Sequence, residues 1–162
     1  MELISIISCS YLMGSIPFGY LLTKIFLKKD IRDIGSGNIG ATNALRTGNK
    51  LIGYSTLTLD VLKAVLPVIF IKFNYPEYIY VSSLSVFIGH VFPLWLKFKG
   101  GKGVATYLGI LFCIDIVFGS IFVITWLLLY LILRSFRGGY LSSDLESSVD
   151  TTVVAVLFLV YS

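Results

Sequence analysis

Residues 28–50 have the sequence KKDIRDIGSGNIGATNALRTGNK, and the interpretation of the whole chain starts from this stretch. Gly35, Gly37 and Gly40 enclose Ser36 and Asn38 between basic residues. Glycine adopts positive φ and allows close approach to the backbone, so successive N–H groups can converge on an oxyanion while Ser and Asn add donors. We therefore interpret the stretch as a phosphate-binding loop. The alternative is an exposed connection between two helices.

The second half of the stretch predicts a short helix over residues 39–45. Asn38 is expected to be its N-cap, and the free N–H groups at that end favour an anion. Asn43 adds a polar side chain, and Arg46 follows about two turns into the helix. The guanidinium of Arg46 is then available to bind a phosphate with two hydrogen bonds.

The composition predicts an integral membrane protein. Of the 162 residues, 56% are hydrophobic and 14% are charged, with a mean hydropathy of +0.88 and a net charge of +4. Soluble domains have about 25% charged residues. Cys9 and Cys113 lie far apart in apolar runs without disulfide or metal spacing, and we interpret both as small buried hydrophobic residues.

Apolar runs predict an all-α, polytopic helix bundle of about five spans plus a partial C-terminal helix. The runs are residues 3–26, 51–73, 78–96, 104–114 and 116–133. We expect the first to kink at the Gly14–Pro17 segment, where Ser15 either hydrogen-bonds the freed carbonyls or faces a site. The resulting domains are a membrane domain (1–134) and a divergent polar segment with an incomplete terminal helix (135–162).

Charged and polar residues inside the spans have structural and functional interpretations. Asp60 and Lys63 are spaced i, i+3, so they can pair within one helix and lock it to a neighbour, or they can contact substrate. His90 is the single histidine of the chain, and no Cys, Glu or second His stands at ligand spacing, so we expect no metal site there. A hydrogen-bonded structural role and a functional role both stay open for His90.

A second glycine-rich basic segment, KFKGGKGVAT, occupies residues 97–106. It is not a Walker A loop, because no Gly precedes Gly101 by five positions and Gly103 follows Lys102. Lys102 between Gly101 and Gly103 can still place a compact charge beside converging N–H groups.

The distribution of cations predicts the topology. Eleven of the 13 Lys and Arg residues fall in the last turn of the first span or after the first, third and fifth spans. The positive-inside rule places these three loops in the cytoplasm with the N-terminus outside. Those residues are Lys24, Lys28, Lys29, Arg32, Arg46, Lys50, Lys97, Lys99, Lys102, Arg134 and Arg137. Both glycine-rich segments then share one face of the membrane and can close over one anionic ligand.

These motifs resemble the bacterial acyl-phosphate:glycerol-3-phosphate acyltransferase (PlsY) family. The matching segments, in family order and spacing, are GSIPFG (14–19), DIRDIGSGNIGATNALR (30–46), LDVLK (59–63), GHVFP (89–93) and FKGGKGVAT (98–106). The resemblance implies a bacterial inner-membrane enzyme with a cytoplasmic site. Its reaction transfers an acyl group from acyl phosphate to the sn-1 hydroxyl of glycerol 3-phosphate, giving lysophosphatidic acid and phosphate in phospholipid synthesis. Membrane lipid is a further partner, and no metal or other cofactor is implied.

The family's functional residues map onto the two glycine-rich segments. Ser36, Arg46 and Lys102 match its phosphate-binding serine, arginine and lysine, and we expect them to be catalytic. The surrounding phosphate-binding positions are Gly35, Gly37, Asn38, Gly40, Gly101 and Gly103. Supporting positions are Ser15, Asn43, Asp60, Lys63 and His90.

The chain departs from the family pattern after the fifth span. The family's His-x-x-Asn-Ile-x-Arg-Leu motif is absent, and the composition changes at about residue 135, which predicts a truncated or frameshifted gene. One alternative is therefore an inactive homologue. Another is a small transporter of phosphate esters, although the motifs crowd one face rather than the bilayer centre. A nucleic-acid partner is not expected, because the cations lie in short loops of a membrane protein.

Overall fold

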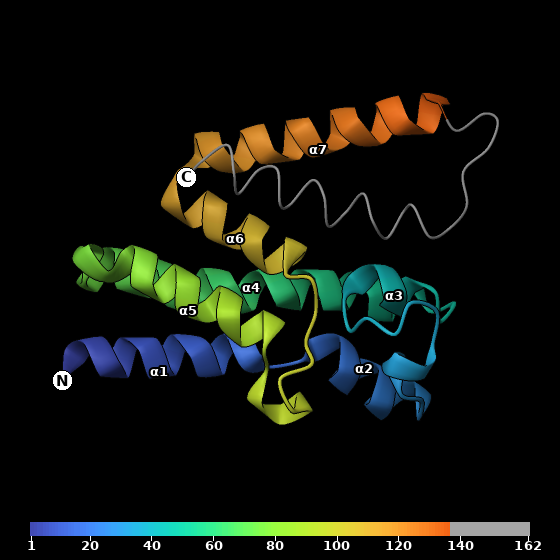
Figure 1. Ribbon diagram of the computed structural model, residues 1–162, viewed down its shortest axis with the longest axis horizontal. Coiled ribbons are helices and arrows are strands. Elements are labelled where there is room, and N and C mark those ends of the chain that lie inside the picture. The colour runs from blue at the N-terminus through green and yellow to red at the C-terminus, as the bar shows by residue number, and fades with distance from the viewer. Residues whose placement is uncertain (137–162) are drawn as a thin grey trace.

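The computed structural model describes residues 1–136, and every regular element in that range is a helix (Figure 1). The expected incomplete terminal helix and most of the polar segment lie outside the described residues. In chain order the elements are α1 (Glu2–Ser15), α2 (Phe18–Leu27), η1 (Ile31–Asp33), α3 (Ala41–Leu45), α4 (Lys50–Asn74), η2 (Pro76–Tyr78), α5 (Ile79–Val91), η3 (Leu94–Leu96), α6 (Val104–Ile114) and α7 (Ile116–Phe136).

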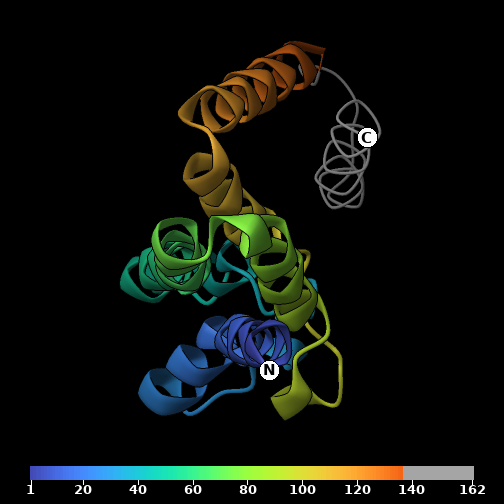
Figure 2. The same cartoon turned by 90° about the vertical axis from the view of Figure 1, so that its left-hand side faces the viewer.

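Helices α1, α4 and α5 form the centre of the described bundle, and each contacts the other two. Helix α6 packs against α4 and leads away from it to α7 (Figure 2). Both glycine-rich segments lie toward the end of the bundle that holds α2 and α3, whereas the N-terminus lies at the opposite end (Figure 1). The fold therefore gathers the two basic segments on one side.

The expected spans agree with the observed helices. Two segments, Glu2–Leu27 and Pro76–Leu96, are long and apolar enough to cross a membrane by length and composition. Helix α4 has 25 residues, which corresponds to about 37 Å. Helix α6 has 11 residues, so it is too short to cross alone, as the sequence indicated.

Small residues allow α1 and α5 to pack closely. A Cβ atom on Gly14 would overlap the backbone of Val86, and one on Gly89 would overlap the backbone of Tyr11. The hydroxyls of Ser10 and Ser82 hydrogen-bond across the same contact at 2.9 Å. Membrane helices associate through small residues of this kind, because lipid provides little hydrophobic driving force.

The Gly14–Pro17 segment breaks the first span into two helices. Ile16 has extended backbone geometry, and the ammonium of Lys63 donates a hydrogen bond to the Ile16 carbonyl at 2.8 Å. Within residues 1–136, the fully buried Ser15 hydroxyl has no hydrogen-bond partner. Ser15 therefore does not satisfy the freed carbonyls, and Lys63 bonds one of them instead.

The expected pairing of Asp60 and Lys63 is confirmed. Lys63 Nζ lies 2.8 Å from Asp60 Oδ1, and both side chains are almost completely buried. Because Lys63 also bonds Ile16, the ion pair of α4 is attached to the break between α1 and α2. The pair is therefore an internal lock between elements.

The prediction that both cysteines are buried is correct for Cys113 and wrong for Cys9. Cys113 is buried in a cluster with Ala64, Val68 and Ile110. Cys9 is exposed on α1, because it points away from the face that packs on α5. Exposed large apolar side chains are frequent on this bundle, as expected for helices that face lipid.

Replacing Gly89 with Ala tests the packing of α1 against α5. The added methyl group has no space beside the Tyr11 carbonyl, so we expect a loss of about 1–3 kcal/mol of stability. Leu84→Ala is the control, because Leu84 lies exposed on the same helix. Thermal denaturation in one detergent compares them, and equal midpoints for the two variants would contradict the packing account.

Replacing Asp60 with Asn tests the buried ion pair. The variant leaves the Lys63 ammonium without a counter-charge, so we expect a loss of about 3–5 kcal/mol. Asp60→Asn combined with Lys63→Met removes the unpaired charge and should recover part of that loss. Denaturation midpoints of the unaltered chain and the two variants measure this. A double variant less stable than Asp60→Asn would contradict the claim that the unpaired Lys63 charge causes the loss.

Candidate functional site

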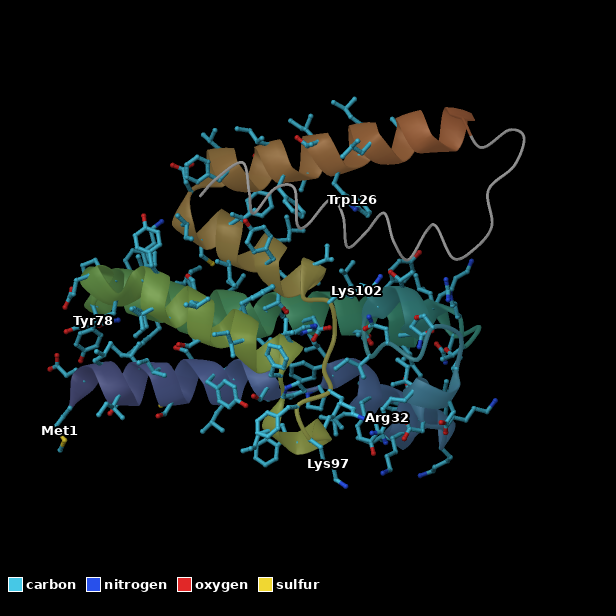
Figure 3. All side chains as sticks on the ribbon, viewed as in Figure 1. Met1, Arg32, Tyr78, Lys97, Lys102 and Trp126 are labelled. Carbon is cyan, nitrogen blue, oxygen red and sulfur yellow. The ribbon has the colours of Figure 1, made fainter. Side chains whose placement is uncertain are left out.

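The candidate site consists of the first glycine loop (residues 34–40) and the second glycine loop (residues 97–103). Figure 3 shows Arg32, Lys97 and Lys102 in the half of the molecule that holds α2 and α3. Met1 and Tyr78 lie at the opposite end. These cations therefore lie away from the end of the bundle that holds the N-terminus.

A hydrophobic cluster supports both glycine loops. Ile31, Ile39 and Ala44, which flank or belong to the first loop, are buried in one cluster with Leu96, which immediately precedes the second loop. Each has at most 6% of its surface exposed. Burial of these apolar side chains keeps two segments about 60 residues apart in sequence on a common base.

Asn43 holds the first glycine loop in shape. Its side chain is 2% exposed, and Nδ2 donates to the carbonyls of Ile31 and Asn38 at 3.0 and 2.8 Å. Oδ1 accepts a hydrogen bond from the Ser36 N–H at 3.0 Å. Because the amide bonds three points of the loop, its role is to shape the site rather than to contact a ligand.

The first glycine loop brings Ser36 and Arg46 together. Gly35 has a φ of +52°, and a Cβ atom there would lie 2.8 Å from Arg46 Cδ and 3.4 Å from Arg46 Nη1. The Arg46 side chain therefore crosses the backbone next to Ser36. Both Ser36 and Arg46 are exposed, so an anion can reach the serine and the guanidinium.

The short helix begins later than expected. Helix α3 starts at Ala41 with Gly40 as its N-cap, and it has only five residues. Asn38 is not the cap, because its Oδ1 accepts a hydrogen bond from the Gly40 N–H at 3.0 Å within the loop. Arg46 is the C-cap residue, so it lies closer to the loop than the predicted two turns.

The two arginines near the first glycine loop differ in their partners. Arg32 Nη2 lies 2.6 Å from Asp30 Oδ2, and hydrogen bonds from the guanidinium lower the pKa of Asp30 to about 2. Asp30 is therefore charged at neutral pH and neutralises Arg32. Within residues 1–136 no carboxylate pairs with Arg46. Arg46 is thus the arginine available for a phosphate.

Glycines hold the second glycine loop against the end of α5. The Gly100 and Gly101 N–H groups donate to the carbonyls of Val91 and His90 at 3.1 and 3.2 Å. Gly103 has a φ of +79° and precedes the first residue of α6. A Cβ atom at Gly103 would overlap the Phe87 ring. Lys102 is therefore the one side chain that residues 100–103 can present at the start of α6.

His90 lies in a buried polar network beneath the second glycine loop. Its Nδ1 is 3.1 Å from Thr106 Oγ1, and the Thr106 hydroxyl donates to the Asp60 carbonyl at 3.2 Å. His90 is 3% exposed and Thr106 is fully buried. The hydrogen-bonded interpretation of His90 is confirmed by these contacts.

Sequence reasoning assigned no role to Thr106 or Leu96. Thr106 belongs to a quoted motif, but its bonds to α4 and α5 depend on tertiary structure. Across the described part of the chain, no group of three or more His, Cys, Asp or Glu side chains is arranged to hold a metal ion.

The chain is similar to known proteins in sequence and in fold. The family model for glycerol-3-phosphate acyltransferase matches residues 4–161. A glycerol-3-phosphate acyltransferase of Pelagibacter ubique is 62% identical over 161 residues, which cover 99% of this chain and 81% of the relative. One from Bartonella henselae is 52% identical over 132 residues, covering 77% of this chain and 62% of the relative. The family and Pelagibacter matches therefore reach farther than residues 14–106, which the quoted motifs span.

A solved structure is similar along most of the chain. It is described as PlsY (YgiH), an integral membrane glycerol 3-phosphate acyltransferase, in its glycerol 3-phosphate form. The TM-score is 0.75 at 30% identity, covering 98% of this chain and 88% of that one. A second form of that protein, with lysophosphatidic acid, gives a TM-score of 0.73 at 29% identity. The chain therefore belongs to the glycerol-3-phosphate acyltransferase family and is an integral membrane enzyme of that family.

Proposed function

We propose that this chain transfers an acyl group from an acyl phosphate to the sn-1 hydroxyl of glycerol 3-phosphate. The hydroxyl oxygen bonds to the acyl carbon, the bond between that carbon and the phosphate oxygen breaks, and the hydroxyl proton ends on the released phosphate. The products are lysophosphatidic acid and inorganic phosphate. The observation that carries the proposal is the common hydrophobic base of the two glycine loops. Solved forms of the similar protein with glycerol 3-phosphate and lysophosphatidic acid support the same substrate and product here.

The protein can accelerate such a reaction by positioning the two reactants and by neutralising the charge of their phosphates. An acyl phosphate is already activated, so holding the two reactants together lowers much of the barrier. Arg46 offers a planar fork for two phosphate oxygens, and Lys102 offers a compact charge. Ser36 and the loop N–H groups add hydrogen bonds to the anion.

The proposed site faces the cytoplasm at the inner membrane of a bacterium. The positive-inside rule favours this side for the two glycine loops, because Lys97, Lys99 and Lys102 belong to the second loop and Arg32 and Arg46 lie beside the first. Glycerol 3-phosphate can then reach the loops from water. The exposed apolar surface of the helices leaves the acyl chain of the donor and product in contact with lipid.

Purified chain in lipid, supplied with acyl phosphate and glycerol 3-phosphate, tests the proposal. We expect lysophosphatidic acid from the unaltered chain, and a loss of about 10²–10³ in kcat from Arg46→Ala or Lys102→Ala. Arg32→Ala is the matched control for Arg46 because Asp30 already neutralises Arg32. Lys99→Ala is the control for Lys102, because Lys99 is exposed in the same loop.

Three results would contradict this function. A folded chain that forms no product would favour an inactive homologue. Uptake of labelled glycerol 3-phosphate into sealed vesicles without acylation would favour a transporter. Equal losses from the control and the site variants would show that general charge, rather than the two proposed cations, supports the reaction.

A further inference from the structure

The second glycine loop rests on the imidazole of His90. A Cβ atom on Gly101 would overlap His90 Nε2, so the Gly101 backbone lies against the Nε2 edge of the ring. The Gly101 N–H also donates to the His90 carbonyl at 3.2 Å. His90 therefore contacts Gly101, the residue before Lys102, through both its main chain and its side chain.

The hydrogen bonds of Thr106 assign a tautomer to His90. A hydroxyl has one hydrogen, and the Thr106 hydroxyl donates it to the Asp60 carbonyl at 3.2 Å. In this arrangement the hydroxyl oxygen accepts from His90 Nδ1, which lies 3.1 Å away. The hydrogen-bond network thus assigns the proton of His90 to Nδ1, and Nε2 is the atom nearest the loop.

The carboxylate of Asp60 does not orient the ring. Asp60 Oδ1 lies 3.8 Å from His90 Nδ1, which is too long for a hydrogen bond, and it is paired with Lys63 at 2.8 Å. The connection from α4 to His90 runs instead through the Asp60 main-chain carbonyl and Thr106. His90 is therefore not part of a carboxylate–histidine pair of the kind that activates a nucleophile.

We propose that His90 is a positioning residue for Lys102: with its Nδ1–H held by Thr106, the ring supports residues 100–103 and fixes the direction in which Lys102 points. This inference rests on the proposed function only for the role of Lys102 in phosphate binding. The support of the loop itself is a property of the fold. At 3% exposure, His90 acts through the loop and not by touching substrate.

Substitutions at Thr106 separate this role from simple packing. Thr106→Val keeps the shape but removes both hydrogen bonds, whereas Thr106→Ser keeps the hydroxyl. A small displacement of the Lys102 ammonium from the phosphate should lower kcat/KM by about tenfold to a hundredfold in Thr106→Val. Thr106→Ser should keep much of the activity. The same pair is measured in a Lys102→Ala background, where Thr106→Val should have little further effect, because residues that act as a unit are not additive.

Substitutions at His90 test the tautomer. The amide nitrogen of Asn can take the place of Nδ1–H and donate to Thr106, whereas Gln extends toward the Nε2 position. We expect His90→Asn to keep more kcat/KM than His90→Gln. His90→Asn and His90→Gln also test the positioning role of His90 if Thr106→Val does not fold. Equal activities in the two variants would overturn the tautomer assignment.

Amide hydrogen exchange supplies a readout that does not depend on catalysis. In the full chain, Thr106→Val should speed exchange in the peptide covering residues 99–104, where Gly100 and Gly101 donate to α5, relative to Thr106→Ser. Unchanged exchange, or a loss of kcat/KM that is fully additive with Lys102→Ala, would overturn the proposal. If the unaltered chain forms no lysophosphatidic acid, the proposed function fails, while the exchange result still decides whether His90 and Thr106 hold the loop.

Discussion

The ammonium of Lys63 is buried inside a helix bundle, and its contacts organise much of the described structure. It bonds the Ile16 carbonyl at 2.8 Å, where Pro17 interrupts the first span, and it is paired with Asp60 one turn earlier in α4. A free carbonyl inside the bundle is costly where water is absent. The bond therefore stabilises a break that would otherwise be expensive, and the break lets α2 take its own direction.

The same turn of α4 is connected to both glycine loops. On one side, α2 carries Tyr20, Leu22 and Leu27, which pack on the hydrophobic cluster under the first glycine loop. On the other side, the Asp60 carbonyl accepts from Thr106, and Thr106 bonds the histidine beneath the second glycine loop. Residues 60–63 thus link the two glycine loops to one long helix. A rigid support of this kind is what a site built on loops needs to hold its geometry.

Electrostatics then distinguish the cations of the site from those of the surface. Arg32 is neutralised by Asp30, and its guanidinium also lies 5.1 Å from the centre of the Tyr20 ring. Its positive charge is therefore already paired within the protein. Arg46 lies across the backbone at Gly35 without a carboxylate partner in the described range. Topology alone explains why basic loops share one face. The difference between Arg32 and Arg46 is a local feature that topology does not require.

Much of the fold could be predicted because membrane helices leave strong signals in sequence. Apolar runs located the spans, and Gly14 to Pro17 located the interruption of the first one. The i, i+3 spacing of Asp60 and Lys63 predicted their pairing, which the structure confirms. These features depend on local spacing and on the length needed to cross a bilayer.

Features that depend on distant partners were not predictable. Asn38 has the chemistry of an N-cap, yet it bonds Gly40 inside the loop, whose backbone is also held by Asn43. Thr106 looks like an ordinary helix residue until α4 and α5 are placed beside it. Cys9 lies in an apolar run, and only the packing of α1 on α5 decides which face is exposed.

The central claim is that both glycine loops bind one phosphorylated acceptor, and hydrogen exchange of the unaltered chain with added glycerol 3-phosphate tests it most directly. We predict that exchange slows in residues 34–40 and in residues 100–103 over the same concentration range. Slowing in only one loop, or in neither, while lysophosphatidic acid still forms would contradict the account.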